Sequence, residues 1–431
     1  MSDGATIAFF PEAAYGPALN SVAIAQACRE RGHEPVFITD PGMEGVFEEY
    51  GFEEQYVNMT EPMPPEEKAE YWDEFINRHI PNFDLPPHEQ TDNYIKECWE
   101  AIVETAEWAE KELPDALEAV DPDVVCVDNV VMFPAIKRHD APWVRITSCT
   151  ENEIPDPEIP PYLSGCRADD RDCFERFERK FEDAIEPVHE EFNEFLEANG
   201  VDPYPLGQFL ETSPYLNLLL YPEPMQWERH EPLDPERFQY LEGCVRKEER
   251  YDVPEFGERN DAPLLYLSFG SLGAGDTDLM KRLIEFFGSQ PYRCLVNVGE
   301  YIEAYDESAT PDNVELDNWF PQPSVIDQAD VVIHHGGNNT TNECLYYGTP
   351  AIVMPYVWDG QDNATRVDET GHGIKLHRSE WSDEELVGSI ERCLEDDEIR
   401  SRLDATAERM QSENGPEKAA RLLDALVEEH V

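Results

Sequence analysis

The chain has 431 residues, more than one hydrophobic core usually organises, so we expect two domains of roughly 200 residues each. Hydrophobic residues make up 40% of it, but no apolar stretch approaches the ~20 residues of a membrane-spanning helix, which excludes stable membrane insertion and leaves only peripheral membrane contact open. The 94 acidic and 32 basic side chains give a formal net charge of −62, and such a surface repels polyanions, which excludes nucleic acid as an electrostatic partner.

The first half of the chain alternates apolar runs with helical segments. Residues 7–10 form a short apolar run, followed by a turn-rich loop over 11–17 and by apolar residues at helical spacing that stop at Gly32. This order predicts a strand, a loop and a helix that ends at a glycine. Further strands are predicted at 36–39, 124–128, 144–147 and 216–220. Strands that alternate with helices indicate a mostly parallel α/β sheet.

Two helical insertions interrupt this first half. One is a charged stretch around 174–195, and the other lies between the second and third predicted strands. The second insertion is rich in large aromatic residues, namely Tyr71, Trp72, Phe75, Trp99 and Trp108. Such residues fit the core of a helical layer as well as the wall of a ligand pocket.

A polar segment with Pro254 and Gly257 separates this pattern from a second one of the same kind, with strands predicted at 264–269, 294–298, 331–334, 351–354 and 374–376. We therefore place an N-terminal domain at 1–245, a linker at 246–262, a second doubly wound domain at 263–410 and a C-terminal helix within 411–431.

The ten cysteines, from Cys28 to Cys393, include no C-x-x-C pair and no short cluster with histidine, which disfavours a zinc site and a redox dithiol. We expect buried thiols in a reducing compartment, no metal and no other cofactor. Residues 1–10 lack the basic and then apolar layout of a signal peptide, so we expect a cytoplasmic protein.

Acidic residues are spread along the whole chain rather than gathered in one tail, with dense stretches at 66–74, 151–158, 175–194 and 383–397. A dispersed acidic coat on an ordinary core resembles the proteins of salt-loving organisms, especially halophilic archaea, whose molar salt screens charges within ~3 Å. In dilute buffer the same charges should repel one another and weaken the fold.

The most informative stretch runs from 318 to 373. It contains W-F-P-Q at 319–322, H-G-G-N-N-T-T-N-E at 335–343 and G-T-P at 348–350. A buried strand is predicted to end at His334, Gly336 and Gly337 allow the backbone to approach a ligand, and a helix is predicted to begin at about Thr340. The exposed amides and the positive dipole end of such a helix suit a pyrophosphate.

The polar side chains of this stretch fit the same ligand. His335, Asn339 and Thr340 can donate hydrogen bonds to phosphate oxygens. Each of these signals is weak alone, because a histidine beside two glycines is often structural, and Asn338 and Asn339 could simply cap the helix.

A nucleoside could occupy the space beside the phosphates. Glu343 lies one helical turn after Thr340, where its two oxygens could accept hydrogen bonds from a ribose diol. Trp319 offers a flat face on which a base could stack, and Gln322 follows it in a turn.

Together these motifs resemble the donor-binding signature of the UDP-glycosyltransferase family, inverting GT-B enzymes that include plant secondary-metabolite and bacterial macrolide glycosyltransferases. Y-L-S-F-G-S at 266–271 is similar to the loop whose last serine, here Ser271, contacts the diphosphate. Residues 9–36 resemble the first strand, loop and helix of the family, and residues 415–423 resemble its closing helix. The middle of the first domain is unmatched.

The resemblance implies two Rossmann-like domains that face each other across a cleft, with the donor held by the second domain and the C-terminal helix packed back on the first. It places Trp319 against uracil, Gln322 in the base pocket and Glu343 at the ribose hydroxyls. It also places His335 and Thr340 at the diphosphate, with Gly336, Gly337 and Asn339 beside them. Asp359 matches an acid that contacts sugar hydroxyls. Gly360 stands where the family has glutamine, and Gln361 follows one residue later.

The first loop departs from the family pattern. The family has a histidine base in G-H-x-x-P, whereas this chain has Gly16, Pro17, Ala18, Leu19 and Asn20, so that a proline stands at the histidine position. Proline cannot accept a proton. We expect Tyr15, Gly16, Pro17 and Asn20 to line the acceptor side.

Another base is therefore required. Asp128 matches the acid that partners the family histidine and is the best remaining candidate, although it could instead be a cap or turn residue after its strand. His33 is less suitable, because it follows Gly32 at the far end of the helix.

These features predict inverting transfer of a hexose from a nucleotide-diphosphate sugar, a UDP-sugar, to a hydroxyl of a hydrophobic small molecule or lipid bound among the aromatic insertion. Two alternatives stay open. Pro17 is compatible with a non-catalytic protein that binds a nucleotide sugar or a partner enzyme. A sugar-nucleotide epimerase shares the GT-B layout but does not need the aromatic insertion.

Overall fold

The computed structural model describes residues 4–64, 71 and 74–430. The strands of the first sheet are β1 (Thr6–Pro11), β2 (Glu34–Thr39), β3 (Glu53–Tyr56), β4 (Val124–Asp128), β5 (Trp143–Thr147), β6 (Leu216–Leu219) and β7 (Phe238–Tyr240). Those of the second sheet are β8 (Leu264–Ser268), β9 (Arg293–Asn297), β10 (Val314–Asp317), β11 (Val331–His334), β12 (Ala351–Val353) and β13 (Gly373–Lys375).

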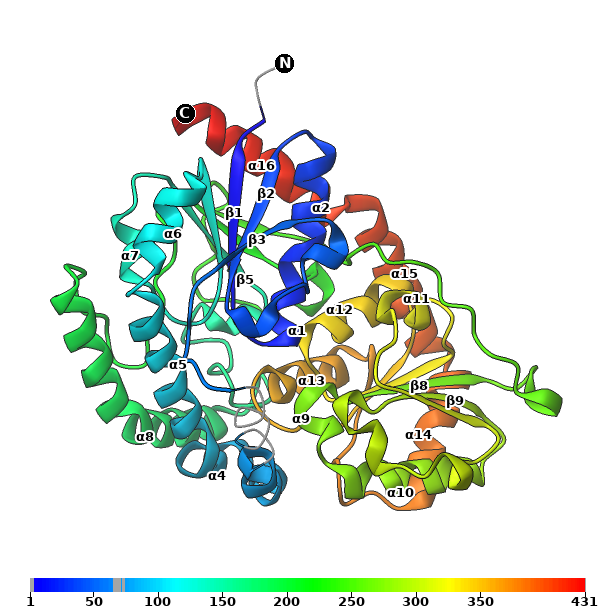
Figure 1. Ribbon diagram of the computed structural model, residues 1–431. Coiled ribbons are helices and arrows are strands. Elements are labelled where there is room, and N and C mark those ends of the chain that lie inside the picture. Colours follow the sequence, from blue (N-terminus) through cyan, green and yellow to red (C-terminus); the bar gives the residue numbers. More distant parts are fainter. Residues whose placement is uncertain (1–3, 65–70, 72–73, 431) are drawn as a thin grey trace.

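Helices surround both sheets (Figure 1). In the first half they are α1 (Tyr15–Ala18), α2 (Val22–Glu30), α4 (Pro87–Gln90), α5 (Lys96–Ala109), α6 (Leu113–Val120), α7 (Pro134–Arg138) and α8 (Arg171–Ala198). In the second half they are α9 (Gly270–Ala274), α10 (Thr277–Gly288), α11 (Gln322–Ile326), α12 (Asn338–Tyr347), α13 (Asp359–Thr370), α14 (Asp383–Glu395), α15 (Asp397–Glu413) and α16 (Gly415–His430). Within the described ranges, none of these helices is long and apolar enough to cross a membrane.

The strand orders are those of two doubly wound domains. The first sheet has the order β3-β2-β1-β4-β5-β6-β7 and the second β10-β9-β8-β11-β12-β13, and the strands pair in parallel in both. In each sheet the order reverses at the first strand of the domain, and ligands of such sheets bind beside this reversal, at the carboxyl ends of the strands. The prediction of two Rossmann-like α/β domains is confirmed.

The predicted strands are the well-buried ones. β4, for example, is buried at every position, as expected of a central parallel strand with helices on both faces. Three strands were not predicted, namely β3, β7 and β10, and each lies at the edge of its sheet with few buried residues. Without a continuous apolar run, an edge strand gives a weak sequence signal.

The first loop is shorter than predicted, because α1 begins at Tyr15 and a 3₁₀ turn over 19–21 then leads into α2. Pro17 therefore lies inside a helical turn. A proline is tolerated there, because the first amides of a helix have no partner within the helix.

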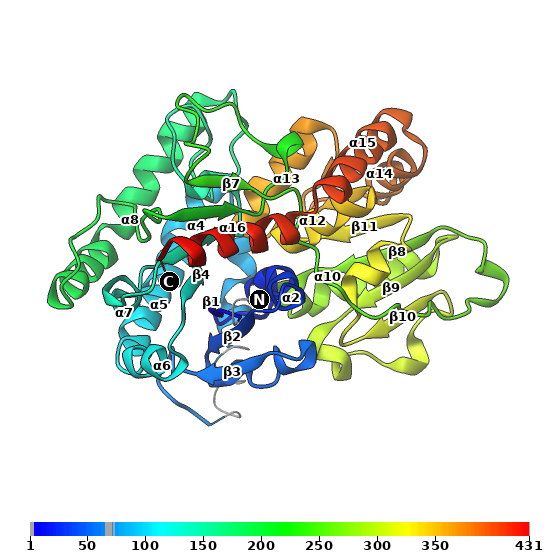
Figure 2. The ribbon, with the colours of Figure 1, turned by 90° about the horizontal axis from the view of Figure 1, so that it is seen from above.

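The C-terminal helix crosses back over the first domain, as Figure 2 shows for α16. It packs against α2 and β4. Its buried residues Ala419, Ala420, Leu423 and Leu426 share one hydrophobic core with α2. The chain thus ends on the domain in which it began.

The expectation of ten free thiols is wrong, because Cys166 and Cys173 form a disulfide. The turn between them brings their Cα atoms to 5.9 Å, within the range that a disulfide spans, although their spacing is not a C-x-x-C pair. Cys173 lies in the first turn of α8. The other eight cysteines are free thiols.

The aromatic insertion lies after β3 rather than directly after β2 and contacts both domains. Trp99 on α5 stacks on Phe209 with ring centroids 4.1 Å apart, and its ring lies 5.7 Å from Trp358 of the second domain. Phe75 is also buried, whereas Trp72 lies outside the described residues.

Candidate functional site

The predicted phosphate-binding stretch lies at the carboxyl edge of the second sheet. β11 ends at His334, and α12 starts at Asn338, two residues before the predicted start. The His335 ring fills the space between two glycines, since a Cβ atom on Gly337 would lie 2.5 Å from its Nε2 atom and one on Gly270 would lie 3.0 Å from its Cε1 atom. Burial lowers the pKa of His335 to about 4, so the ring is a neutral hydrogen-bonding group near neutral pH.

A second helix begins against this one. A Cβ atom on Gly360 would lie 2.6 Å from the His335 carbonyl oxygen, and one on Gly336 would lie 2.6 Å from the Gly360 carbonyl oxygen. Only glycine allows two backbones this close, and Gly336 also has a φ of +94°. This contact leaves no room for a Cβ atom at position 360, where the resemblance implied a glutamine.

Asp359 caps α12 from the start of α13. Its carboxylate accepts a hydrogen bond from the Asn338 backbone amide at 3.0 Å and one from the Asn363 side chain at 3.2 Å. Burial raises the pKa of Asp359 to about 8, with nearby carboxylates as smaller causes. One amide of the predicted anion site is therefore already held by an internal acid.

Three asparagines of α12 bind the first domain. Asn338 donates to the Ser148 and Leu220 carbonyl oxygens at 2.6 and 3.1 Å, Asn342 donates to Leu220 at 3.1 Å, and Asn339 donates to Gly16 at 2.9 Å. The alternative of Asn338 and Asn339 as caps is wrong, because both lie inside the helix and their amides face carbonyl groups of the other domain. The Asn339 side chain is likewise directed at Gly16 instead of a phosphate.

Glu343 lies at the centre of a buried polar network. Its two oxygens accept hydrogen bonds from the Arg246 guanidinium at 2.8 Å and from the Gln322 amide at 2.6 Å. Gln322 also donates to the Thr340 hydroxyl at 3.1 Å and accepts from the Tyr266 hydroxyl at 3.3 Å. The structure thus brings Gln322, Thr340 and Glu343 together.

Other predicted donor residues are more dispersed. Trp319 follows β10 and is 39% exposed, and Ser271 lies in α9, the helix next to His335. Gln361 is not directed into this site, because its amide donates to the Tyr356 carbonyl oxygen at 3.0 Å and its side chain is buried.

On the acceptor side, Tyr15, Gly16 and Pro17 form α1, and Asn20 is buried in the turn after it. Asp128 ends β4, and its oxygens accept hydrogen bonds from Ser21 at 2.8 Å and Ser148 at 2.5 Å. Its exposed fraction is only 2%. Burial raises the pKa of Asp128 to about 7.

Two charged residues near these sites were missed. Arg246 lies at the start of the predicted linker, where no local pattern distinguishes it, yet it is 5% exposed and pairs with Glu343 and Glu248. Glu12 directly follows β1, and its backbone amide donates to the Asp128 carbonyl oxygen at 2.8 Å. Its position directly after a buried strand could have identified Glu12 from the sequence as a candidate site residue.

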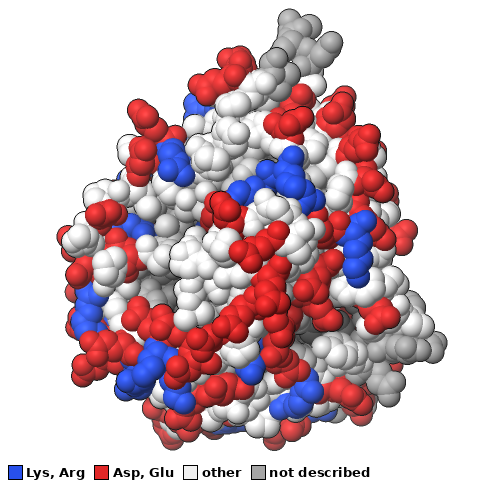
Figure 3. Space-filling view, turned by 90° about the vertical axis from the view of Figure 1, so that its left-hand side faces the viewer, with Lys and Arg blue, Asp and Glu red and all other residues white. Residues whose placement is uncertain are grey.

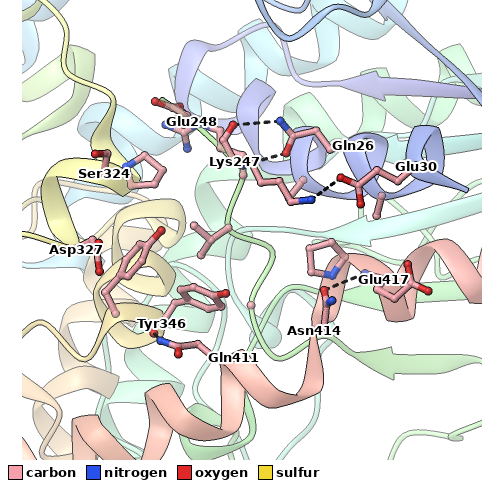
Figure 4. A pocket seen from close by; sticks show the side chains of 18 of the residues that line it. Gln26, Glu30, Lys247, Glu248, Ser324, Asp327, Tyr346, Gln411, Asn414 and Glu417 are labelled. Atoms are coloured by element: carbon pink, nitrogen blue, oxygen red, sulfur yellow. Dashed lines mark hydrogen bonds and ion pairs between the residues drawn. The ribbon is translucent and has the colours of Figure 1, made fainter. Parts of the chain in front are cut away.

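A cavity of about 470 Å³ lies beside residues 243–250, and Arg246 and Glu248 are among the residues that line it (Figure 4). It is bordered by α2, by residues 243–250, by α11 and by the ends of α12 and α15. Lys247 and Gln26 form hydrogen bonds there, and Lys247 pairs with Glu30. The residues that line it include none of the predicted site residues. Within the described ranges, no group of three or more His, Cys, Asp or Glu side chains is arranged to hold a metal ion.

The Arg246 network generates a stability prediction. Arg246→Ala should lower the free energy of unfolding by ~3–5 kcal/mol, because it leaves the Glu343 and Glu248 carboxylates buried without their cation. Lys247→Ala is the matched control: Lys247 and its partner Glu30 have 72% and 61% of their side chains exposed, so its loss should cost less than ~1 kcal/mol. Equilibrium denaturation of the three proteins measures both effects, and equal losses would contradict the role given to Arg246.

Part of the second domain matches a known family model. Residues 298–426 match the model described as erythromycin biosynthesis protein CIII-like, C-terminal domain. The NDP-glycosyltransferase YjiC of Bacillus subtilis is 27% identical over 256 residues, which are 59% of this chain and 64% of that protein. The demethyllactenocin mycarosyltransferase of Streptomyces fradiae is 25% identical over 359 residues, 80% of this chain and 73% of that protein. The chain thus spans roughly two thirds of the length of these relatives.

Solved structures resemble the whole chain. The glycotransferase of kitacinnamycin has a TM-score of 0.72 at 20% identity and covers 99% of this chain and 100% of its own. The calicheamicin glycosyltransferase CalG4 has a TM-score of 0.68 at 20% identity and covers 99% of both chains. The glycosyltransferase VinC, solved in complex with dTDP, has a TM-score of 0.66 at 16% identity over 98% of this chain and 100% of its own. The chain therefore has the GT-B fold of these structures, and residues 298–426 are similar to the erythromycin biosynthesis protein CIII-like C-terminal domain.

Proposed function

We propose that this protein is an inverting glycosyltransferase that moves a hexose from a nucleotide-diphosphate sugar to a hydroxyl group of a hydrophobic acceptor. The observation that carries the proposal is the arrangement at α12. A neutral histidine lies beside glycines at the start of the helix, and Gln322, Thr340 and Glu343 form one polar network a turn later. The glycosyltransferase relatives support this assignment.

The donor of the proposal is a UDP-sugar. Its diphosphate would accept hydrogen bonds from His335 and Thr340, with Ser271 nearby, and its ribose would meet Glu343. Trp319 would stack on the base, and Asp359 would contact the sugar hydroxyls. VinC and the spinosyn rhamnosyltransferase SpnG were solved with thymidine diphosphate, so dTDP is the nucleotide to compare with UDP.

The acceptor would bind where the aromatic insertion meets the second domain. Trp358 directly precedes Asp359 and lies near both Trp99 and Tyr162, with ring centroids 5.7 and 6.3 Å away. Large aromatic rings beside a sugar-binding acid suit an apolar molecule that carries a hydroxyl. A small molecule and a lipid both meet this description.

The competing function is binding of a nucleotide sugar without transfer, which Pro17 favours because it removes the family base. Acceptor-dependent release of UDP separates the two functions, since only transfer requires an acceptor. Release of UDP would reject the non-catalytic function, and a changed sugar on an intact nucleotide would identify an epimerase.

Donor binding gives a direct prediction. His335→Ala should weaken the binding of UDP-glucose by ~1–3 kcal/mol in calorimetric titration, because it removes a hydrogen bond to a charged group. The exposed His377 is the control, since His377→Ala removes the same side chain elsewhere in the domain. Glu343→Gln keeps the side-chain size and should also weaken binding; because it removes the carboxylate that pairs with Arg246, its unfolding must be measured beside its titration. If the titration of His335→Ala is unchanged, His335 does not bind the diphosphate. If dTDP binds more tightly than UDP, the base of the donor nucleotide is thymine rather than uracil.

We also propose that the acidic surface is adapted to concentrated salt. Acidic side chains cover more of the face in Figure 3 than basic ones, in keeping with the net charge of −62. The melting temperature should rise when KCl is raised from about 0.1 M to about 1 M, because the screening length falls from ~10 Å to ~3 Å. Sodium chloride at the same ionic strength should act similarly. A melting temperature that is highest in dilute buffer would contradict the salt adaptation.

A further inference from the structure

The proposed reaction lacks an evident proton acceptor. Pro17, at the position of the family histidine, has no basic group. Asp128 is 2% exposed, and each of its oxygens already accepts a hydrogen bond from a buried serine hydroxyl. Asp128 keeps lone pairs that accept no hydrogen bond, but its burial leaves an acceptor hydroxyl little access to them.

Glu12 is the neighbouring carboxylate with a free side chain. Pro11 at the end of β1 pairs with Asp128 at the end of β4, so Glu12 extends one residue past this edge of the sheet. Its backbone amide is held by the Asp128 carbonyl group at 2.8 Å. Its side chain is only half-buried and, within the described part of the chain, has no hydrogen-bond or ion-pair partner.

The surroundings of Glu12 come from three parts of the molecule. The titratable groups close enough to interact with its charge are Tyr94 and Cys98 of the aromatic insertion, Asp128, Cys149 and Glu153 at the edge of the first sheet, and Asp359 at the start of α13. The loop that Glu12 begins contacts α12 through the Gly16 carbonyl group, which accepts a hydrogen bond from Asn339 at 2.9 Å, and Asp359 caps the start of the same helix. Glu12 therefore lies on the side of the first domain that faces the acid assigned to the donor sugar.

The chemistry of this position suits a general base. Burial, and next the charge of Glu153, raise the pKa of Glu12 to about 7. A carboxylate with such a pKa is a stronger base than an ordinary glutamate and is still largely ionised slightly above neutral pH. Glu153 is itself paired with Arg145 at 3.1 Å, so it is less available than Glu12.

We propose that Glu12, rather than Asp128, is the catalytic base that takes the proton of the acceptor hydroxyl; this inference rests on the proposed glycosyl transfer. As the hydroxyl oxygen forms its bond to the anomeric carbon, its proton passes to the Glu12 carboxylate. The bond from the anomeric carbon to the diphosphate oxygen breaks, and its electron pair leaves with UDP. Glu12 then returns the proton to solvent.

The experiment uses two acceptors of similar size and different acidity, 4-methylphenol and 4-nitrophenol, with UDP-glucose as donor and UDP release as the readout. Glu12→Gln should lower kcat with 4-methylphenol by ~10²–10⁴-fold, because this phenol must lose its proton to a base. The loss should be much smaller with 4-nitrophenol in assays slightly above neutral pH, where this more acidic phenol is mostly ionised and needs no base. Glu34 begins β2 and so lies at the other edge of the sheet from Glu12, which follows the end of β1. Glu34→Gln removes an exposed carboxylate there and is the matched control.

The pH profile gives an independent readout. With 4-methylphenol, kcat/KM of the wild type should fall as the pH drops below about 7, because the base must be ionised, and Glu12→Gln should lose this step. Glu12→Asp keeps a carboxylate and should restore the step at a reduced rate. Titration with UDP shows that each variant retains its donor site.

The possible outcomes distinguish failure of the role given to Glu12 from failure of the proposed glycosyl transfer. A Glu12→Gln enzyme with full turnover of 4-methylphenol, or with equal losses on both phenols, overturns the role of Glu12. Loss of the pH step in Asp128→Asn but not in Glu12→Gln returns the role to Asp128. If the wild type binds UDP but releases none with either phenol, the proposed transfer fails, and the inference fails with it.

Discussion

Three asparagine side chains on one helix determine how the two halves of this molecule meet. Asn338, Asn339 and Asn342 donate to the backbone carbonyl groups of Gly16, Ser148 and Leu220, which follow three strands of the first sheet. The Ser148 and Leu220 carbonyl groups are buried, and leaving either without a partner would cost ~1–3 kcal/mol. Because all strands of a parallel sheet end at the same edge, this contact brings the carboxyl edges of both sheets together. The acids of the two domains become neighbours as a result.

Close backbone packing within the second domain fixes the start of α12. Gly336 and Gly360 let the starts of α12 and α13 touch, and Asp359 caps the first of these helices. Arg246, from the linker, balances the charge of Glu343 behind them. A buried ion pair of this kind adds little net stability but is costly to break, so it holds the linker in one position.

Charge is the recurrent difficulty for an anionic ligand in this protein, given its net charge of −62. The acids nearest the junction of the domains carry less negative charge than ordinary acids do. Burial raises the pKa of Glu12 and of Asp128 to about 7 and that of Asp359 to about 8, so each is partly protonated near neutral pH. The negative charge at the junction is therefore smaller than the composition implies, and a neutral His335 adds no charge of its own. The diphosphate of the proposed donor would meet less repulsion there than at the surface.

Local patterns in the sequence determined the two α/β domains, the central strands and the glycine-rich start of α12. Buried apolar runs and glycines reveal these features because each of them favours a particular local backbone conformation. They did not determine the edge strands β3, β7 and β10, which have few buried residues. The partners of Asn338 and Glu343 lie in distant parts of the chain, the Cys166–Cys173 disulfide depends on the turn between its cysteines, and the availability of the Glu12 carboxylate depends on what surrounds it. Only the tertiary structure decided these contacts, because hydrogen bonds, charges and disulfides depend on distances between segments that the chain order leaves open.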